Sequence, residues 1–251
     1  MTEALLAVSD LSKSFGSLRV SDGITLEVRA GETHALIGPN GAGKTSLVHQ
    51  LSGLLDCDSG RIVFGGRDIT RTSMPQRALQ GLARSFQITS ILPGFTALEN
   101  AALAAQARSG SSFRFLAPAA EEKALNDEAL QALASVGLAH RKDILAGEMS
   151  HGEKRLLEIA IAAAMAPKLL LLDEPLAGLG QEESKSCISL LKRLKSRFSM
   201  VLVEHDMDAV FALADRVSVL VNGSVLATGT PAEIRGNAGV RAAYLGEDEA
   251  A

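Results

Sequence analysis

One short segment of the chain combines glycines with a lysine and a threonine at a spacing suited to binding phosphate. Residues 38–45 read GPNGAGKT and fit the pattern G-x-x-x-x-G-K-[ST]. The pattern requires a strand before it and a helix after it, and the apolar residues 33–37 and the helix-compatible residues 46–51 meet both conditions. The sequence therefore predicts a phosphate-binding loop, with a glycine-rich turn that binds no ligand as the alternative.

This loop offers three kinds of group to a phosphate chain. Glycines let main-chain N–H groups approach the phosphate, and the helix that follows directs further unpaired N–H groups at the same anion. Lys44 adds a positive charge, and the Thr45 hydroxyl is a ligand for Mg²⁺. We expect the nucleotide-binding residues of this segment to be Asn40, Gly41, Ala42, Gly43, Lys44, Thr45 and Ser46.

A second candidate is the acidic pair Asp173 and Glu174. Residues 169–172 are four consecutive leucines, a pattern typical of a parallel strand buried on both faces, so both carboxylates should lie at its C-terminal edge. Ligands of open α/β sheets bind at that edge, and acids buried there without a cation would be costly. We expect Asp173 to reach Mg²⁺, directly or through water, and Glu174 to act on a water beside the terminal phosphate. A helix-capping Asp–Glu pair is the alternative.

Two polar residues follow other predicted strands. Gln87 ends a brief strand at 83–86, and His205 follows a buried strand at 200–203 that should neighbour the leucine strand. Each residue alone is typical of a solvated polar side chain. Both gain interest only if their strands end beside the phosphates.

Residues 14–23 are predicted to form a turn region in which Phe15 and Val20 are the notable apolar side chains. Either residue could belong to the core. Phe15 could instead offer its ring to an adenine, as aromatic side chains do for any base. The residues alone leave these two interpretations open.

A helix predicted at 152–165 has its own N-terminal signal. Ser150 is a good N-cap, and Glu153 three residues later completes a capping box. A structural role as a helix cap is enough to explain these two residues. The same helix N-terminus could also hold a second phosphate.

Hydrophobic periodicity and turn signals predict the remaining elements, and the alanine- and leucine-rich residues 97–166 are predicted to be a helical region. The expected strands are 5–8, 24–28, 61–64, 216–221 and 224–229, the last two joined by an Asn222-Gly223 hairpin turn. The expected helices are 75–82, 97–108, 119–136, 182–197 and 231–244.

Composition excludes several classes of protein. The 251 residues carry a net charge of −4 with no long basic run, so we expect no nucleic-acid partner. The N-terminus lacks the pattern of a secretory signal, and no uncharged apolar stretch reaches the roughly 18 residues of a membrane span, which predicts a cytoplasmic protein. Cys57 and Cys187 match no metal or redox spacing and receive no role.

The chain resembles the ATP-binding subunit of an ABC transporter. The resemblance lies in the order and spacing of the phosphate loop, Gln87, residues 149–153, residues 169–174 and His205. The resemblance covers nearly the whole chain. It implies an α/β fold, a P-loop NTPase ABC cassette with a mixed sheet core, an N-terminal antiparallel β part and a helical subdomain. A single ABC ATPase domain would span 1–251, with the RecA-like core and β part at about 1–87 and 167–251 and the helical subdomain at about 88–166.

The resemblance also implies roles for the candidate residues. Phe15 would stack on the adenine of ATP, with Val20 beside it. Gln87 would link Mg²⁺ and the attacking water to the transporter contact, Glu174 would be the catalytic base, and His205 would contact the terminal phosphate. Two copies would enclose ATP between them, so that Ser150, Gly152 and Glu153 of one subunit bind the nucleotide held by Lys44 of the other.

Details of the sequence are similar to ATPases of branched-chain amino acid uptake systems. They lie at residues 81–87, 95–100, 177–179 and 243–246, and in a long loop around Phe113. Urea or short-amide importers and the lipopolysaccharide-export ATPase share parts of this pattern. The implied partners are two transmembrane permease subunits, a second ATPase subunit that is identical or paralogous, and, indirectly, a periplasmic substrate-binding protein. The expected location is the cytoplasmic face of the bacterial inner membrane, where the chain would be peripheral.

Some residues depart from the common family pattern. Met149, His151 and Glu153 stand where Leu, Gly and Gln are commonest, and Gly180 replaces a frequent Asp. Ser150 and Gly152 are kept, so we expect activity to survive. A soluble ABC ATPase of translation or DNA repair is the rival from another class, but those proteins usually carry two cassettes, long coiled coils or zinc-binding inserts. A phosphate-loop kinase would not explain residues 150–153 or His205.

Overall fold

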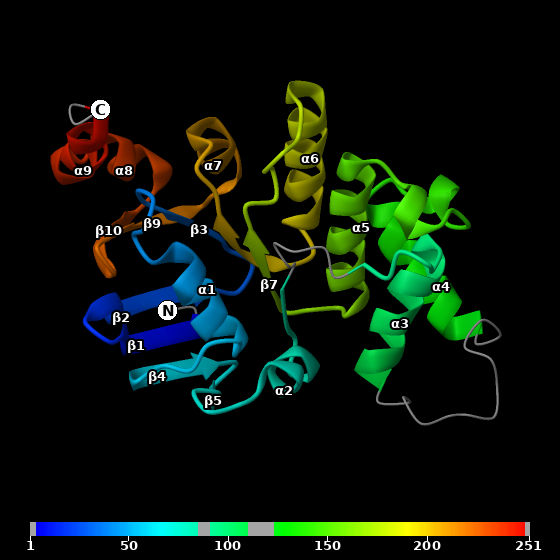
Figure 1. The fold of residues 1–251 in the computed structure, drawn as a ribbon, viewed down its shortest axis with the longest axis horizontal. Coiled ribbons are helices and arrows are strands. Elements are labelled where there is room, and N and C mark those ends of the chain that lie inside the picture. The colour runs from blue at the N-terminus through cyan, green and yellow to red at the C-terminus, as the bar shows by residue number, and fades with distance from the viewer. Residues whose placement is uncertain (1–3, 85–90, 110–122, 249–251) are drawn as a thin grey trace.

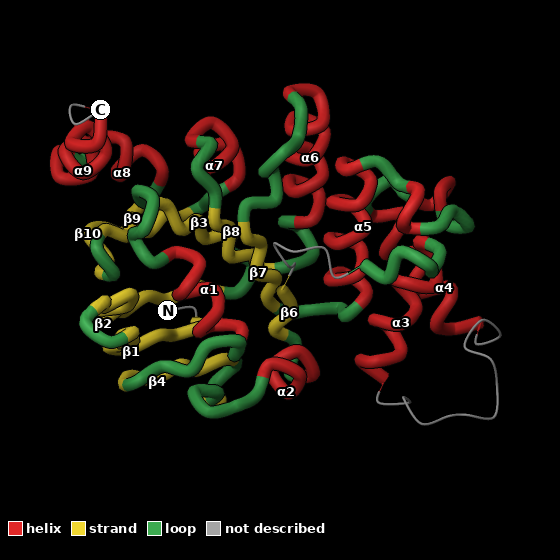
Figure 2. The backbone as a smooth tube through the Cα atoms, in the orientation of Figure 1, coloured by secondary structure: helices red, strands yellow, loops and turns green. Residues whose placement is uncertain are grey.

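The computed structural model describes residues 4–84, 91–109 and 123–248. Its centre is a six-stranded sheet in the order β10-β9-β3-β8-β7-β6 (Figure 2). Neighbouring strands from β9 to β6 are parallel, and β10 is antiparallel to β9. The strands are β3 (Thr33–Ile37), β6 (Leu82–Arg84), β7 (Leu169–Asp173), β8 (Ser199–Val203), β9 (Arg216–Val221) and β10 (Ser224–Gly229). The predicted mixed sheet is confirmed.

The leucine run of β7 is buried on both faces, as predicted. Leu170 and Leu172 pack in one core with helix α6 (Gln181–Leu194), α7 (Met207–Leu213) and α5 (His151–Ala164). Leu169 and Leu171 pack in another core with α1 (Lys44–Ser52) and the second sheet. Because successive side chains of a strand point to opposite faces, an unbroken apolar run fits this two-sided environment.

The second sheet is antiparallel, in the order β2-β1-β4-β5. Its strands are β1 (Ala4–Phe15), β2 (Leu18–Arg29), β4 (Ser59–Phe64) and β5 (Arg67–Asp68). The predicted turn region at 14–23 was wrong in extent: β1 and β2 pair as far as Phe15 and Leu18, so the turn is confined to Gly16 and Ser17. Polar residues on the exposed face of this hairpin obscured the strand pattern in the sequence.

The helices α3 (Ala97–Ser109), α4 (Lys123–Ser135) and α5 gather on the opposite side of β7 from α1 (Figure 1). Short 3₁₀ turns at Ala139–Arg141 and Ala146–Glu148 lead into α5. This is the helical part that the sequence predicted, and α2 (Met74–Leu79) lies before β6. Gln87 and the loop around Phe113 lie outside the described residues.

The predicted helix at 231–244 is two helices, α8 (Pro231–Gly236) and α9 (Ala238–Asp248). Asn237 separates them with an extended backbone, and its side-chain oxygen accepts hydrogen bonds from the N–H groups of Gly239 and Val240. Asparagine side chains commonly compete with the helix for main-chain groups in this way, which accounts for the break. The apolar periodicity continues across it, and for that reason the sequence pattern predicts a single helix.

The phosphate loop between β3 and α1 depends on glycine where the backbone is crowded. Gly38 has φ +151°, and a Cβ there would lie 2.1 Å from the carbonyl oxygen of Leu220 in β9. Gly43 has φ +98°, and its Cβ would lie 2.3 Å from the carbonyl oxygen of Val20. Gly41 has φ +78° but open space around it. The sheet edge therefore tolerates no side chain at two of the three loop glycines.

The glycine requirement can be tested within the loop itself. Gly41→Ala should cost only the left-handed backbone penalty, about 1–2 kcal/mol of unfolding free energy. Gly38→Ala adds the clash with Leu220 and should cost about 1–3 kcal/mol more. Calorimetric melting of both variants checks this, and equal melting temperatures would contradict the close approach of β9.

Candidate functional site

The ammonium group of Lys44 folds back onto the phosphate loop and binds main-chain carbonyls there. Its Nζ donates to the carbonyl oxygens of Gly38, at 2.6 Å, and Pro39, at 2.9 Å, and the residue is only 9% exposed. Leu47 N–H bonds the carbonyl of Gly43, so α1 begins at once after the glycine. The loop thus presents an ammonium group and the open N-terminus of a helix to one space, which is the arrangement that binds phosphate.

The turn between β9 and β10 supports the loop. The N–H of Gly223, in the β9–β10 turn, donates to the carbonyl of Ala42 at 3.0 Å. That turn has φ +49° at Asn222 and +79° at Gly223, which is the geometry of a tight hairpin and confirms the predicted turn. The sequence identified the hairpin but not its contact with the loop.

Asp173 is the most buried acid of the site, at 0% exposure. Its Oδ2 accepts a hydrogen bond from Arg84 Nη2 at 3.0 Å, while its Oδ1 is buried with no hydrogen-bond partner among the described residues. Burial raises the pKa of Asp173, and the Arg84 guanidinium opposes this rise. A buried carboxylate oxygen without a donor is suited to a cation, so this residue fits the predicted Mg²⁺ ligand.

Helix α1 comes close to this carboxylate. Burial lowers the pKa of His49 on α1, the charge of Arg84 lowers it further, and that of Asp173 opposes the change. Three elements, α1, β6 and β7, therefore converge beside the phosphate loop. Thr45 lies in the first turn of this same helix.

Glu174 lies half-buried in a turn held from both sides. Its own N–H donates to the carbonyl of Val203 in β8 at 2.9 Å, and Arg155 of α5 donates to its carbonyl. Its φ is +49°, a left-handed conformation that residues other than glycine rarely adopt. The acidic pair does not cap a helix, so that alternative is excluded.

Glu204 follows β8 and ties the neighbouring strand end to this turn. Its Oε1 accepts from the N–H of Leu176 at 2.8 Å, and its Oε2 accepts from the N–H of His205 at 3.3 Å. Burial raises the pKa of Glu204, and these two N–H donors oppose the rise. The His205 side chain itself is 70% exposed. β7 and β8 are adjacent, as predicted, and His205 lies two residues beyond the end of β8.

Phe15 is 53% exposed at the end of β1, so it is not a core residue. The ammonium of Lys13 lies 5.5 Å from its ring centre. Val20 of β2 is half-buried, and its carbonyl lies against Gly43 of the phosphate loop. This contact places the β1–β2 hairpin beside the loop, where an adenine contact would require it.

The predicted capping box at the start of α5 is confirmed. Ser150 Oγ accepts from Glu153 N–H at 3.2 Å, and Glu153 Oε2 accepts from Ser150 N–H at 2.9 Å. Glu153 also pairs with Arg141 at 2.9 Å, and the hydrogen bond from the Ser150 N–H lowers the pKa of Glu153. The Glu153 carboxylate is thus committed to the helix cap, whereas Ser150 remains exposed.

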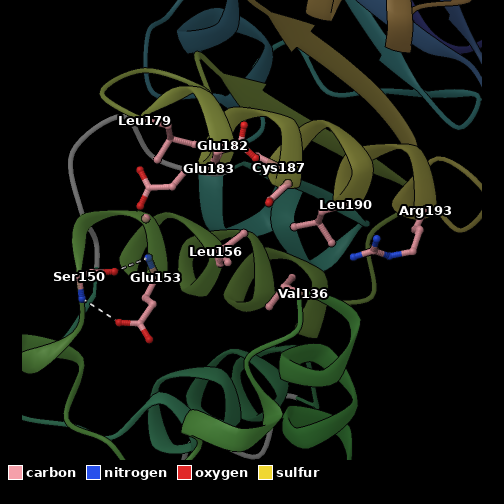
Figure 3. A pocket seen from close by; sticks show the side chains of 12 residues that line it. Val136, Ser150, Glu153, Leu156, Leu179, Glu182, Glu183, Cys187, Leu190 and Arg193 are labelled. Carbon is pink, nitrogen blue, oxygen red and sulfur yellow. Dashed lines mark hydrogen bonds between the residues drawn. The ribbon is translucent and has the colours of Figure 1, made fainter.

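A pocket of about 350 Å³ separates the start of α5 from α6 (Figure 3). Ser150, Gly152 and Glu153 line its α5 side, and Glu182 and Glu183 line its α6 side. Glu183 lies so near that a Cβ on Gly152 would be 2.6 Å from its carboxylate oxygen, so the two helices approach closely here. The pocket flanks the signature segment at 149–153 and not the phosphate loop.

Several polar residues of the site had no sequence signal beyond their charge. These are the buried side chains Arg84, Arg155 and Glu204. Glu204 does directly follow an apolar run, residues 200–203, and a charge in such a place needs a buried partner. Gln87, in contrast, was predicted for the site and lies outside the described residues.

Comparison with known proteins defines the class. The sequence profile described as ABC transporter matches residues 21–177, and the one described as branched-chain amino acid ATP-binding cassette transporter matches residues 224–250. The chain belongs to the ABC transporter family and is its ATP-hydrolysing, nucleotide-binding subunit. The predicted family is confirmed.

The more particular likeness is to one group of these subunits. The chain is 37% identical to the high-affinity branched-chain amino acid transport ATP-binding protein LivG of Salmonella typhimurium, covering 98% of this chain and 100% of that one. It is 35% identical, with the same coverage, to BraF of Pseudomonas aeruginosa, which carries the same description. The solved ADP conformation of the ATP-binding cassette MJ1267 matches with a TM-score of 0.86 at 29% identity, over 98% of this chain and 100% of that one.

The buried Glu204 predicts a pH dependence of stability. The pKa of Glu204 is higher in the folded than in the unfolded protein. Its contribution to the free energy of unfolding is therefore fully present below the unfolded pKa of about 4.3 and is lost as pH rises through the folded pKa. Urea unfolding at several pH values should therefore show the wild type losing stability relative to Glu204→Gln as pH increases above about 4.3. The lost hydrogen bond to His205 adds a constant offset, so parallel curves for the two proteins would contradict the prediction.

Proposed function

We propose that this chain powers an ABC importer of branched-chain or other hydrophobic amino acids by hydrolysing ATP. The observation that carries the chemistry is the buried Oδ1 of Asp173, which has no hydrogen-bond partner among the described residues and ends a strand that contacts the helix after the phosphate loop. The substrate class is supported by the relatives named for branched-chain amino acid transport, which match over nearly their whole length. The match of residues 224–250 to a profile of that group supports it independently.

In the proposed mechanism, the main-chain amides of the loop and the Lys44 ammonium hold the phosphates, and Glu174 takes a proton from the attacking water. Catalysis of this kind rests on positioning and on neutralising charge. Thr45 and Asp173, with Gln87, would hold Mg²⁺, which supplies neutralisation of phosphate charge when bound. His205 would contact the terminal phosphate, and Phe15 would cover the adenine with Val20 beside it.

The proposed assembly contains two such subunits. Figure 1 shows α5 on the opposite side of β7 from α1, so one chain presents its signature segment away from its own phosphate loop. A second copy or a paralogue, facing in the opposite direction, would bring Ser150 and Gly152 to the nucleotide of Lys44. The relation to a solved dimeric cassette bound to ADP and Pi, with a TM-score of 0.77 at 21% identity, is one of fold.

Two transmembrane permease subunits, with a periplasmic substrate-binding protein acting through them, would complete the importer. This chain would bind the permeases at the cytoplasmic face of the membrane. Within the described ranges, none of the helices combines the length and apolar character that a bilayer crossing demands. The coupled permeases would set which amino acid is carried.

Replacing the proposed base tests the chemistry. Glu174→Gln keeps the shape of the side chain but removes its proton acceptor, so kcat for ATP hydrolysis should fall by roughly 10²- to 10⁴-fold. Binding of a fluorescent ATP analogue should stay near the wild-type level. Full hydrolysis by the variant would remove Glu174 as the base.

Mixing two inactive variants tests the shared site. Lys44→Ala removes the ammonium from the phosphate loop, and Ser150→Arg blocks the signature segment. In a pair that contains one subunit of each, one of the two composite sites has both defects and the other has neither. Hydrolysis should therefore recover to at most about half of the wild-type rate per pair, whereas each variant alone stays inactive. A mixture as inactive as its components would contradict a site built from two chains.

A further inference from the structure

Arg155 in the second turn of α5 holds three consecutive carbonyl groups of the acidic turn. Its guanidinium donates to the oxygen of Asp173 at 3.0 Å, to that of Glu174, and to that of Pro175 at 3.1 Å. Nη1 of the same group pairs with Glu158 at 2.8 Å. Arg155 is 8% exposed, so these contacts are made out of reach of bulk water.

The turn that Arg155 holds is a strained one. Glu174 has φ +49°, and such a conformation in a residue with a side chain persists only where the surroundings impose it. β8 holds the other side of the turn, through the Glu174 N–H to Val203 and the Leu176 N–H to Glu204. Arg155 therefore supplies the contacts from the helical part, and β8 supplies those from the sheet.

We propose that Arg155 is a positioning residue for ATP hydrolysis, which acts by fixing the main chain of Glu174 and hence the direction of its carboxylate. This inference rests on the proposed function of Glu174 as the base. An arginine suits the task because its planar group carries five N–H donors in a fixed geometry and stays charged, so it can serve several carbonyls at once. A lysine ammonium has three donors around one point and cannot span the same carbonyls.

A second buried arginine provides a matched control. Arg77 is 2% exposed and also donates to main-chain carbonyls, those of Gln50, Leu51, Thr70 and Thr72. It belongs to α2, its guanidinium binds the C-terminal end of α1, and none of these carbonyls belongs to residues 173–175. Replacing Arg77 should lower stability for the same reason, the loss of buried hydrogen bonds to main-chain carbonyls, without disturbing Glu174.

The test compares Arg155→Met, Arg155→Lys and Arg77→Met in ATP hydrolysis, ATP-analogue binding and thermal melting. We expect Arg155→Met to lower kcat by about 10²-fold, the effect of a misplaced reacting group, with KM and nucleotide affinity within about twofold of the wild type. Arg155→Lys should fold with a melting temperature nearer the wild type and still lose about tenfold in kcat. Arg77→Met should lose melting temperature but retain kcat within about twofold.

If both methionine variants lose kcat in proportion to their melting temperatures, or if Arg155→Lys hydrolyses ATP at the wild-type rate, Arg155 is only a structural contact. A double variant separates the remaining cases. In the Glu174→Gln background, Arg155→Met should cause no further loss of the residual rate. The same fold-loss in both backgrounds would show that Arg155 acts on some other group, and normal hydrolysis by Glu174→Gln alone would overturn the proposed role of Glu174 as the base.

Discussion

The structure depends on keeping a carboxylate buried at the end of β7. Asp173 is fully buried, and the Arg84 guanidinium is its charged partner at 3.0 Å. An isolated charge at this depth would be costly, and burial indeed raises the pKa of this group. Arg84 binds one oxygen, and the other has no hydrogen-bond partner among the described residues, which is the arrangement that the proposed cation site would need.

The parallel sheet brings the other groups to the same edge. β3 leads into the phosphate loop, β7 ends at the acidic pair, and β8 leads to Glu204 and His205. Because parallel strands end on a common edge, residues far apart in sequence meet without long loops. The β9–β10 turn and the carbonyl of Val20 then close around the loop glycines, which fixes the loop backbone.

The sequence predicted those parts of the site that obey local rules. The loop spacing, the leucine run, the capping box at Ser150 and the hairpin at Asn222 are each set by residues close together in the chain. Phe15 was left open because exposure depends on the whole sheet, and the break at Asn237 was missed because apolar spacing continued across it. The contacts of Arg84 and Arg155 join segments that are far apart in the sequence and meet only in the folded chain. Their partners could therefore not be predicted from the sequence.

Ser150 caps the N-terminus of helix α5, and Arg155 lies in the second turn of the same helix. A tilt of that helix toward a nucleotide on a neighbouring subunit would therefore also displace the main chain of residues 173–175 in its own subunit. In a pair built as proposed, each hydrolytic centre would sense whether the opposite one is filled. The rate would then rise more steeply with ATP concentration than it does for two independent centres, because helix α5 would couple the occupancy of one centre to the geometry of the other.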